Sequence, residues 1–170
     1  MTKPTTPPPA WEDRIAELWS TIGDYAPEDF VDAMISVVGQ LSANSPEGLF
    51  ELGSAYDSTG QSDQAVPLYQ KALDHGLQPP RRRRAVIQMA SSMRNLGQSN
   101  ESVVLLREEL ARGSDELDDA LHAFLALSLS EMGNEREGLS LVLKALAAHL
   151  PRYHISVANY AELLLDDRND

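Results

Sequence analysis

The sequence contains no cysteine among its 170 residues. A chain without thiols has no disulfide framework, no thiolate zinc site, no iron–sulfur cluster and no cysteine nucleophile. Basic residues are also scarce, because 14 lysines and arginines stand against 26 aspartates and glutamates, for a formal net charge of −12. A surface with this balance repels a phosphate backbone, so we expect no nucleic-acid binding.

Long hydrophobic runs are absent as well. No window approaches 18 uninterrupted apolar residues, so the sequence predicts no membrane-spanning helix. The first ten residues lack the apolar segment of a signal peptide, and a cytoplasmic location is the simplest expectation. With 42% hydrophobic residues the chain can nevertheless bury a core.

The residue patterns that carry chemistry are missing too. No two of the four histidines have the i, i+4 spacing of a helical zinc site, and the acidic residues 115–119 lack the glycine and the closing glutamate of a calcium loop. There is no phosphate-binding glycine loop and no Gly-x-Ser-x-Gly motif. We therefore expect a protein that is not an enzyme and that has no metal site and no cofactor.

Helical periodicity runs through almost every segment after Pro9. Apolar residues recur at spacings of three and four, whereas no segment alternates with period two for long enough to suggest a strand. The sequence therefore predicts an all-α fold. Residues 1–10, with their prolines, are predicted to be a disordered arm, although a proline-rich ligand for a partner remains an alternative. Residues 11–45 are predicted to form an N-terminal capping helical hairpin.

Three glycines mark an internal repeat. Gly60, Gly97 and Gly133 lie in similar surroundings, 37 and 36 residues apart. Each unit has small residues where two helices must approach closely, and a larger residue four positions beyond the second small one. We expect helix, glycine turn and helix in residues 46–79, 80–113 and 114–150, followed by a C-terminal capping helix and tail in 151–170.

The first unit resembles the tetratricopeptide repeat. The residues that carry the resemblance are Leu52, Gly53, Tyr56, Gly60, Ala65, Tyr69 and Ala72. The string from Phe50 to Gly60, the arginines 81–84 and the segment 150–153 also resemble a small, mostly uncharacterised bacterial family of such proteins. The resemblance implies a right-handed α-solenoid of tetratricopeptide-like hairpins that acts as a binding scaffold, and it supplies no catalytic residue.

The resemblance also implies a concave groove lined by the first helix of each hairpin. The groove residues so predicted are Glu47, Phe50, Ser54, Asp57, Arg84, Ile87, Ser91, Arg94, Ala123 and Leu127. They would form an apolar floor of Phe50, Ile87 and Leu127 with two flanking arginines. Such a groove suits a peptide or an amphipathic helix of a partner protein. The chain's own termini could fill it instead.

Charge is unevenly distributed along the chain. Residues 1–70 hold 2 basic and 11 acidic residues, residues 71–112 hold 8 and 4, and residues 113–170 hold 4 and 11. Four consecutive arginines at the start of a helix oppose its dipole, so acidic groups should lie nearby. Pairing with acids of the same chain is one possibility. The other is an acidic segment of a partner, or of a second copy in a structural homo-oligomer whose groove is self-filled.

Overall fold

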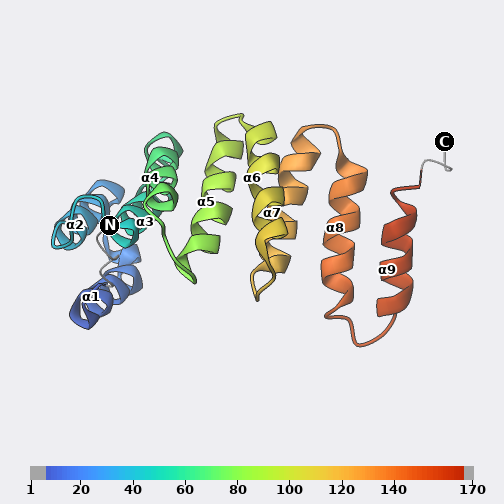
Figure 1. Cartoon of the computed structure of the whole chain (residues 1–170), viewed down its shortest axis with the longest axis horizontal. Coiled ribbons are helices and arrows are strands. Elements are labelled where there is room, and N and C mark those ends of the chain that lie inside the picture. Colours follow the sequence, from blue (N-terminus) through green and yellow to red (C-terminus); the bar gives the residue numbers. More distant parts are fainter. Residues whose placement is uncertain (1–6, 167–170) are drawn as a thin grey trace. The chain divides into compact units, whose positions relative to one another are not determined.

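The computed structural model describes residues 7–166 and divides the chain into two compact units. Unit 1 extends to Ser92 and unit 2 begins at Met93, so the division falls within a helix. All regular structure in the described residues is helical, which confirms the predicted all-α class (Figure 1). Within residues 7–166 no helix is both long and apolar enough to cross a membrane.

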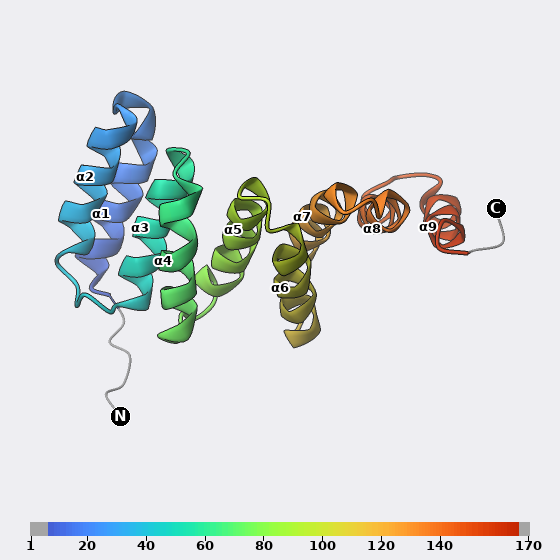
Figure 2. The same ribbon diagram turned by 90° about the horizontal axis from the view of Figure 1, so that it is seen from above.

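Unit 1 consists of two helical pairs and most of a further helix. Helix α1 (Pro9–Ser20), the 3₁₀ turn η1 (Ile22–Asp24) and α2 (Pro27–Val38) are followed by α3 (Pro46–Ser58) and α4 (Ser62–Asp74). Helix α2 packs against both α1 and α3, and α3 packs against α4 (Figure 2). The apolar core between the first three helices contains Trp11, Ile15, Leu18, Phe30, Val31, Met34, Val37 and Ala55.

The N-terminal boundary differs from the prediction. Most of the predicted arm, residues 1–6, lies outside the described residues. Helix α1 begins at Pro9, so the last two residues that were assigned to the arm are helical. Proline suits this position because the first helical residue needs no backbone hydrogen-bond donor. Trp11 Nε1 donates to Val37 O at 3.1 Å and ties α1 to the end of α2.

Helix α5 (Arg81–Asn95) crosses from unit 1 into unit 2, which continues with four further helices. These are α6 (Ser99–Arg112), α7 (Asp118–Glu131), α8 (Glu135–Ala147) and α9 (His154–Leu163). Helix α7 packs against α6 and α8, and α9 packs against α8 (Figure 1). The residues that lengthen the units beyond the usual repeat of 34 lie in the loops before α5 and α7.

The three repeated glycines end helices in the same way. Gly60, Gly97 and Gly133 have φ of 81°, 77° and 78°, a conformation that other residues rarely adopt. The backbone N–H of the residue after each glycine donates a hydrogen bond to a carbonyl oxygen in the last turn of the helix, as Gln98 N does to Met93 O at 2.9 Å. This is the Schellman arrangement, which satisfies the last carbonyls of a helix. The predicted role of these glycines is confirmed.

Small residues bring paired helices close together, as the repeat pattern predicts. A Cβ on Gly138 of α8 would lie 2.9 Å from Ala126 O of α7, which is too close for any real side chain. In unit 1 a Cβ on Gly53 would lie 3.1 Å from the ring of Tyr69. The two hairpins α3–α4 and α7–α8 therefore depend on glycine at their contact, and their backbones set the position of the surrounding side chains.

Candidate functional site

The predicted groove residues are distributed over both units. Unit 1 holds seven of them, on α3 and on the first part of α5, and unit 2 holds Arg94, Ala123 and Leu127. Their roles in binding stay predictions. The two groups differ in exposure: Phe50 and Ile87 are 0% and 7% exposed, whereas Leu127 is 47% exposed.

Phe50 and Ser54 are integral parts of the packing of unit 1. The Phe50 ring lies 6.2 Å from the ring of Tyr69, and the guanidinium carbon of Arg84 lies 5.2 Å from its centre. Ser54 Oγ donates to Gln88 Oε1 at 3.2 Å and accepts from the Tyr69 hydroxyl at 3.4 Å. Buried in this way, both side chains hold α3 to its neighbours, and the exposed Arg84 covers the aromatic ring.

Half-buried Asp57 joins a polar network in the same unit. Ser92 Oγ donates to Asp57 Oδ1 at 2.6 Å, and the Tyr69 hydroxyl donates to Asp57 Oδ2 at 3.5 Å. Burial raises the pKa of Asp57, while the hydrogen bonds from Ser92 and Tyr69 oppose that rise. Burial also raises the pKa of Tyr69, so the phenol remains protonated and able to donate. The network connects α3, α4 and α5.

Arg81, the first of the four arginines, is engaged within unit 1. Its Nη2 lies 2.6 Å from Glu12 Oε2, and its Nε lies 2.8 Å from Glu51 Oε1. Trp19 Nε1 donates to the other Glu51 oxygen at 2.8 Å. Burial opposes the charge of Arg81, but the hydrogen bonds and charges of Glu12 and Glu51 outweigh it and raise the pKa of the guanidinium. The sequence left two alternatives for the arginines, namely acids of the same chain or acids of a partner. For Arg81 the structure shows the first.

Arg94 also has a partner within its unit. Its Nη1 lies 2.7 Å from Glu131 Oε1, and Ser99 Oγ donates to Glu131 Oε2 at 2.6 Å. The hydrogen bonds from Ser99 and Arg94 lower the pKa of Glu131. The charge that was expected to flank the groove floor is therefore already compensated at Arg94.

An open apolar hollow of about 410 Å³ lies between α7 and α8 in unit 2. It is lined by Ala123, Ala126, Leu127, Ser130, Glu135, Gly138, Leu139 and Val142. Two of these, Ala123 and Leu127, are predicted groove residues. The α8 side was not foreseen: Leu139 and Val142 are 50% and 39% exposed, and no residue of α9 contributes to the lining.

At the position of Val142 the α7–α8 hairpin differs from the other two hairpins in the exposure of the side chain. In the repeat alignment it is equivalent to Tyr69 and Leu106, which are both 0% exposed. The same repeat position is thus core in two units and surface in the third. Valine is smaller than the tyrosine and the leucine at the equivalent positions. A smaller side chain does not by itself predict exposure, so the sequence did not reveal this hollow.

The described residues offer little for metal or acid–base chemistry. Nowhere in 7–166 do three or more histidine or carboxylate side chains form a group that could hold a metal ion. His149 Nε2 lies 2.7 Å from Asp119 Oδ2, and both side chains are largely exposed. The hollow itself contains one carboxylate, that of Glu135, and no second titratable side chain. Its chemistry suits the binding of apolar groups.

The helical hairpins are similar in sequence and in fold to those of known proteins. A family model described as "Tetratrico peptide repeat" matches residues 46–164. The solved structure "MamA MSR-1 C2" is similar, with a TM-score of 0.59 and 18% identity over 90% of this chain and 77% of that chain. A structure of a MamA point mutant gives 0.57 and 17% over 89% and 77%. At these identities the similarity shows the fold alone. No curated protein matches this sequence.

Proposed function

We propose that this chain, which belongs to the tetratricopeptide repeat family, is a non-catalytic scaffold that binds a peptide or helix of a partner protein in its concave groove. Helical-repeat proteins generally serve as protein-interaction scaffolds, because stacked hairpins create extended binding surfaces. The single observation that carries the proposal is the apolar hollow between α7 and α8, which includes the predicted groove residues Ala123 and Leu127.

The hollow has the properties of a seat for apolar side chains. Its walls are two helices held at a fixed distance by Gly138, so the site exists before a partner arrives. Leu127, Leu139 and Val142 each keep 39–50% of their surface in contact with solvent. Burying one leucine-sized side chain contributes about 1.5–3 kcal/mol. A partner helix with apolar residues at i, i+3 or i+4, and i+7 could use several such contacts.

An acidic segment in the partner is supported mainly by Arg84. Its side chain is exposed above Phe50, while Arg94 is paired with Glu131. Arg81 and Arg107 likewise bind acids of their own units. Arg112 pairs with Glu109 as well. Assembly of copies through the basic second repeat is therefore the weaker alternative, because at least four of its arginines already have acidic partners.

The experiment is affinity capture from the native lysate with two matched variants. Leu127→Lys places a charge in the hollow, and Val104→Lys changes an exposed apolar residue on α6 that is outside it. Proteins bound by the wild type and by Val104→Lys, but lost with Leu127→Lys, support the proposal. Identical profiles for all three proteins contradict it. Arg84→Glu tests the acidic segment, since only a partner that uses that segment is lost.

A further inference from the structure

Helix α9 presents an apolar face to solvent. Ala161 is its only buried residue, whereas Ile155, Tyr160 and Leu163 are 66%, 67% and 49% exposed. At about 100° per residue these three side chains fall within an arc of about 140° on the side opposite Ala161. Large exposed apolar side chains that gather on one face usually mark an interaction site. The face of α9 therefore points to an occupant.

The centre of this face carries no charge. The same arc contains Ser156 and Asn159, whereas Glu162 lies about 20° outside it, with a side chain that is 71% exposed and pairs with Lys144 at 3.7 Å. The chain as a whole has a net charge of −12, so an uncharged patch is a departure from its general surface. A partner would have to match apolar groups, the amide of Asn159 and the hydroxyl of Ser156.

The face is complementary to itself. Ile155, Asn159 and Leu163 are spaced at i, i+4 and i+8, with the amide at the midpoint. When two such helices cross antiparallel at Asn159, each Ile155 meets the Leu163 of the other copy, as a twofold interface requires. The two Asn159 amides can then donate to and accept from each other. A single buried asparagine pair of this kind fixes the register of helix pairing.

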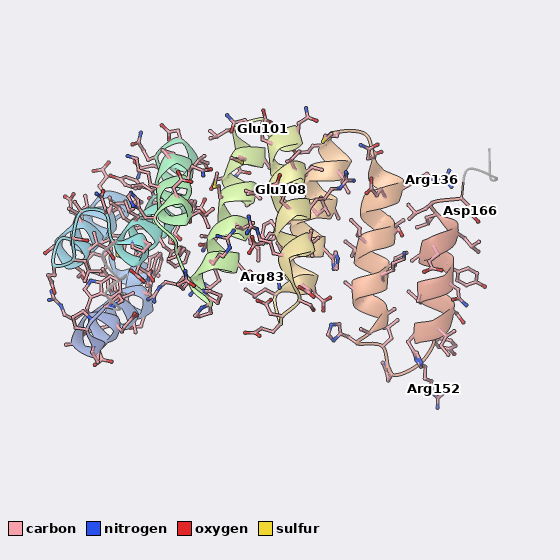
Figure 3. The ribbon with its side chains drawn as sticks, viewed as in Figure 1. Arg83, Glu101, Glu108, Arg136, Arg152 and Asp166 are labelled. Atoms are coloured by element: carbon pink, nitrogen blue, oxygen red, sulfur yellow. The ribbon has the colours of Figure 1, made fainter. Side chains whose placement is uncertain are left out.

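The charges at the ends of α9 favour the same arrangement. Arg152 precedes the helix and Asp166 follows it, so they lie at opposite ends (Figure 3). Both are seven residues from Asn159, and antiparallel pairing therefore places Arg152 of one copy near Asp166 of the other. Asp166 also has an interaction within its own chain. A basic residue before α9 opposes the dipole of the helix, whereas the acidic end of an antiparallel neighbour compensates that residue.

We infer that α9 is a homodimerisation helix, which pairs antiparallel with α9 of a second copy about a twofold axis at Asn159. This interface uses none of the residues that line the α7–α8 hollow, so it is independent of the proposed function. One ten-residue helix provides less than the roughly 800 Å² per partner of a standard interface. We therefore expect a weak dimer that dissociates on dilution.

The absence of cysteine allows a direct test by site-directed cross-linking of the full chain. Asn159→Cys should form a disulfide-linked dimer under mild oxidation, because facing helices bring equivalent α-carbons at the axis within disulfide range. Ile155→Cys alone should not, since antiparallel copies separate this residue from its equivalent by about 12 Å along the helix. A mixture of Ile155→Cys and Leu163→Cys should cross-link. Val104→Cys is the control for random collision.

Association in solution provides the second measurement. Sedimentation velocity over the micromolar range should show at least tenfold weaker dimerisation for Leu163→Lys and unchanged dimerisation for Val104→Lys. Arg152→Asp or Asp166→Arg alone should weaken it several-fold, and the combined charge exchange should restore it. A monomer at all concentrations, or a cross-link by Ile155→Cys alone, would overturn the inference. Retained binding of a hollow-dependent partner in either case leaves the proposed function standing.

Discussion

Replacement of Arg81 by alanine should destabilise unit 1 far more than replacement of an exposed arginine. Arg81 links α5 to α1 through Glu12 and to α3 through Glu51. The Glu51 side chain is only 3% exposed, and that of Arg81 is 19% exposed. Removal of the guanidinium therefore leaves a buried carboxylate without its counter-ion.

The magnitude follows from this burial. Breaking a buried ion pair by removing one partner costs about 3–5 kcal/mol, because the remaining charge is uncompensated. Trp19 still donates to Glu51 at 2.8 Å, and one hydrogen bond to a charged group contributes about 1.5–3 kcal/mol, so part of the interaction survives. Glu12 is 39% exposed and can regain water. We expect the free energy of unfolding to fall by about 3 kcal/mol.

Tryptophan fluorescence during urea unfolding is a suitable assay. The two tryptophans of the chain, Trp11 and Trp19, both lie in unit 1, so the signal follows this unit. Arg14→Ala is the matched control, because Arg14 is an exposed arginine of α1 in the same unit. Replacement of an exposed surface residue usually changes the free energy of unfolding by less than about 0.5 kcal/mol. Arg81→Lys should give an intermediate loss, since an ammonium group cannot reproduce the fork between two carboxylates.

The result that would refute this reasoning is a loss below about 1 kcal/mol for Arg81→Ala, no larger than that of Arg14→Ala. Water would then have replaced the guanidinium at Glu51, and the arginine would not be required within the chain. In that case a charged partner becomes a better explanation for a basic residue at the start of α5.

Two further predictions concern packing and pH. Gly138→Val should lower the free energy of unfolding by about 1–3 kcal/mol, because its Cβ would lie 2.9 Å from Ala126 O. Thermal unfolding followed by circular dichroism measures this loss. An unchanged midpoint would contradict the close approach of the two helices. The raised pKa of Asp57 means that the folded chain takes up a proton before the unfolded chain. The stability of the wild type relative to Asp57→Asn should therefore rise as the pH falls through the raised pKa, and a constant difference in urea unfolding would refute the burial argument.

The hairpins were predictable because their signals are local. Glycines spaced 37 and 36 residues apart require positive φ at a helix end, and the small residues between them indicate close helix contacts. Both features depend on the neighbouring backbone and not on distant partners. The same holds for Pro27 and Pro46, each at the first position of a helix.

The exposure of individual groove residues could not be predicted in the same way. Phe50 occupies a position that usually faces the groove, but Tyr69 from α4 and Arg84 from α5 pack around it. Arg81 donates a hydrogen bond to Glu12, which is 69 residues away in the sequence, and no local pattern predicts that pair. Such partners depend on how helices pack, and the repeat pattern fixes only which helix face is inward.

The distribution of charge finally suggests what holds a partner. Acids of the same unit compensate at least four arginines of the basic segment, namely Arg81, Arg94, Arg107 and Arg112, while the hollow on unit 2 is almost entirely apolar. Salt does not screen apolar contacts. It does screen interactions between exposed charges, because at about 1 M salt the Debye length is only about 3 Å. Capture that depends on Leu127 should therefore persist in 1 M salt, measured as the bound fraction in washes of increasing ionic strength. Release of the partner by salt alone would show that Arg84 and other charges dominate recognition, and that the hollow contributes little.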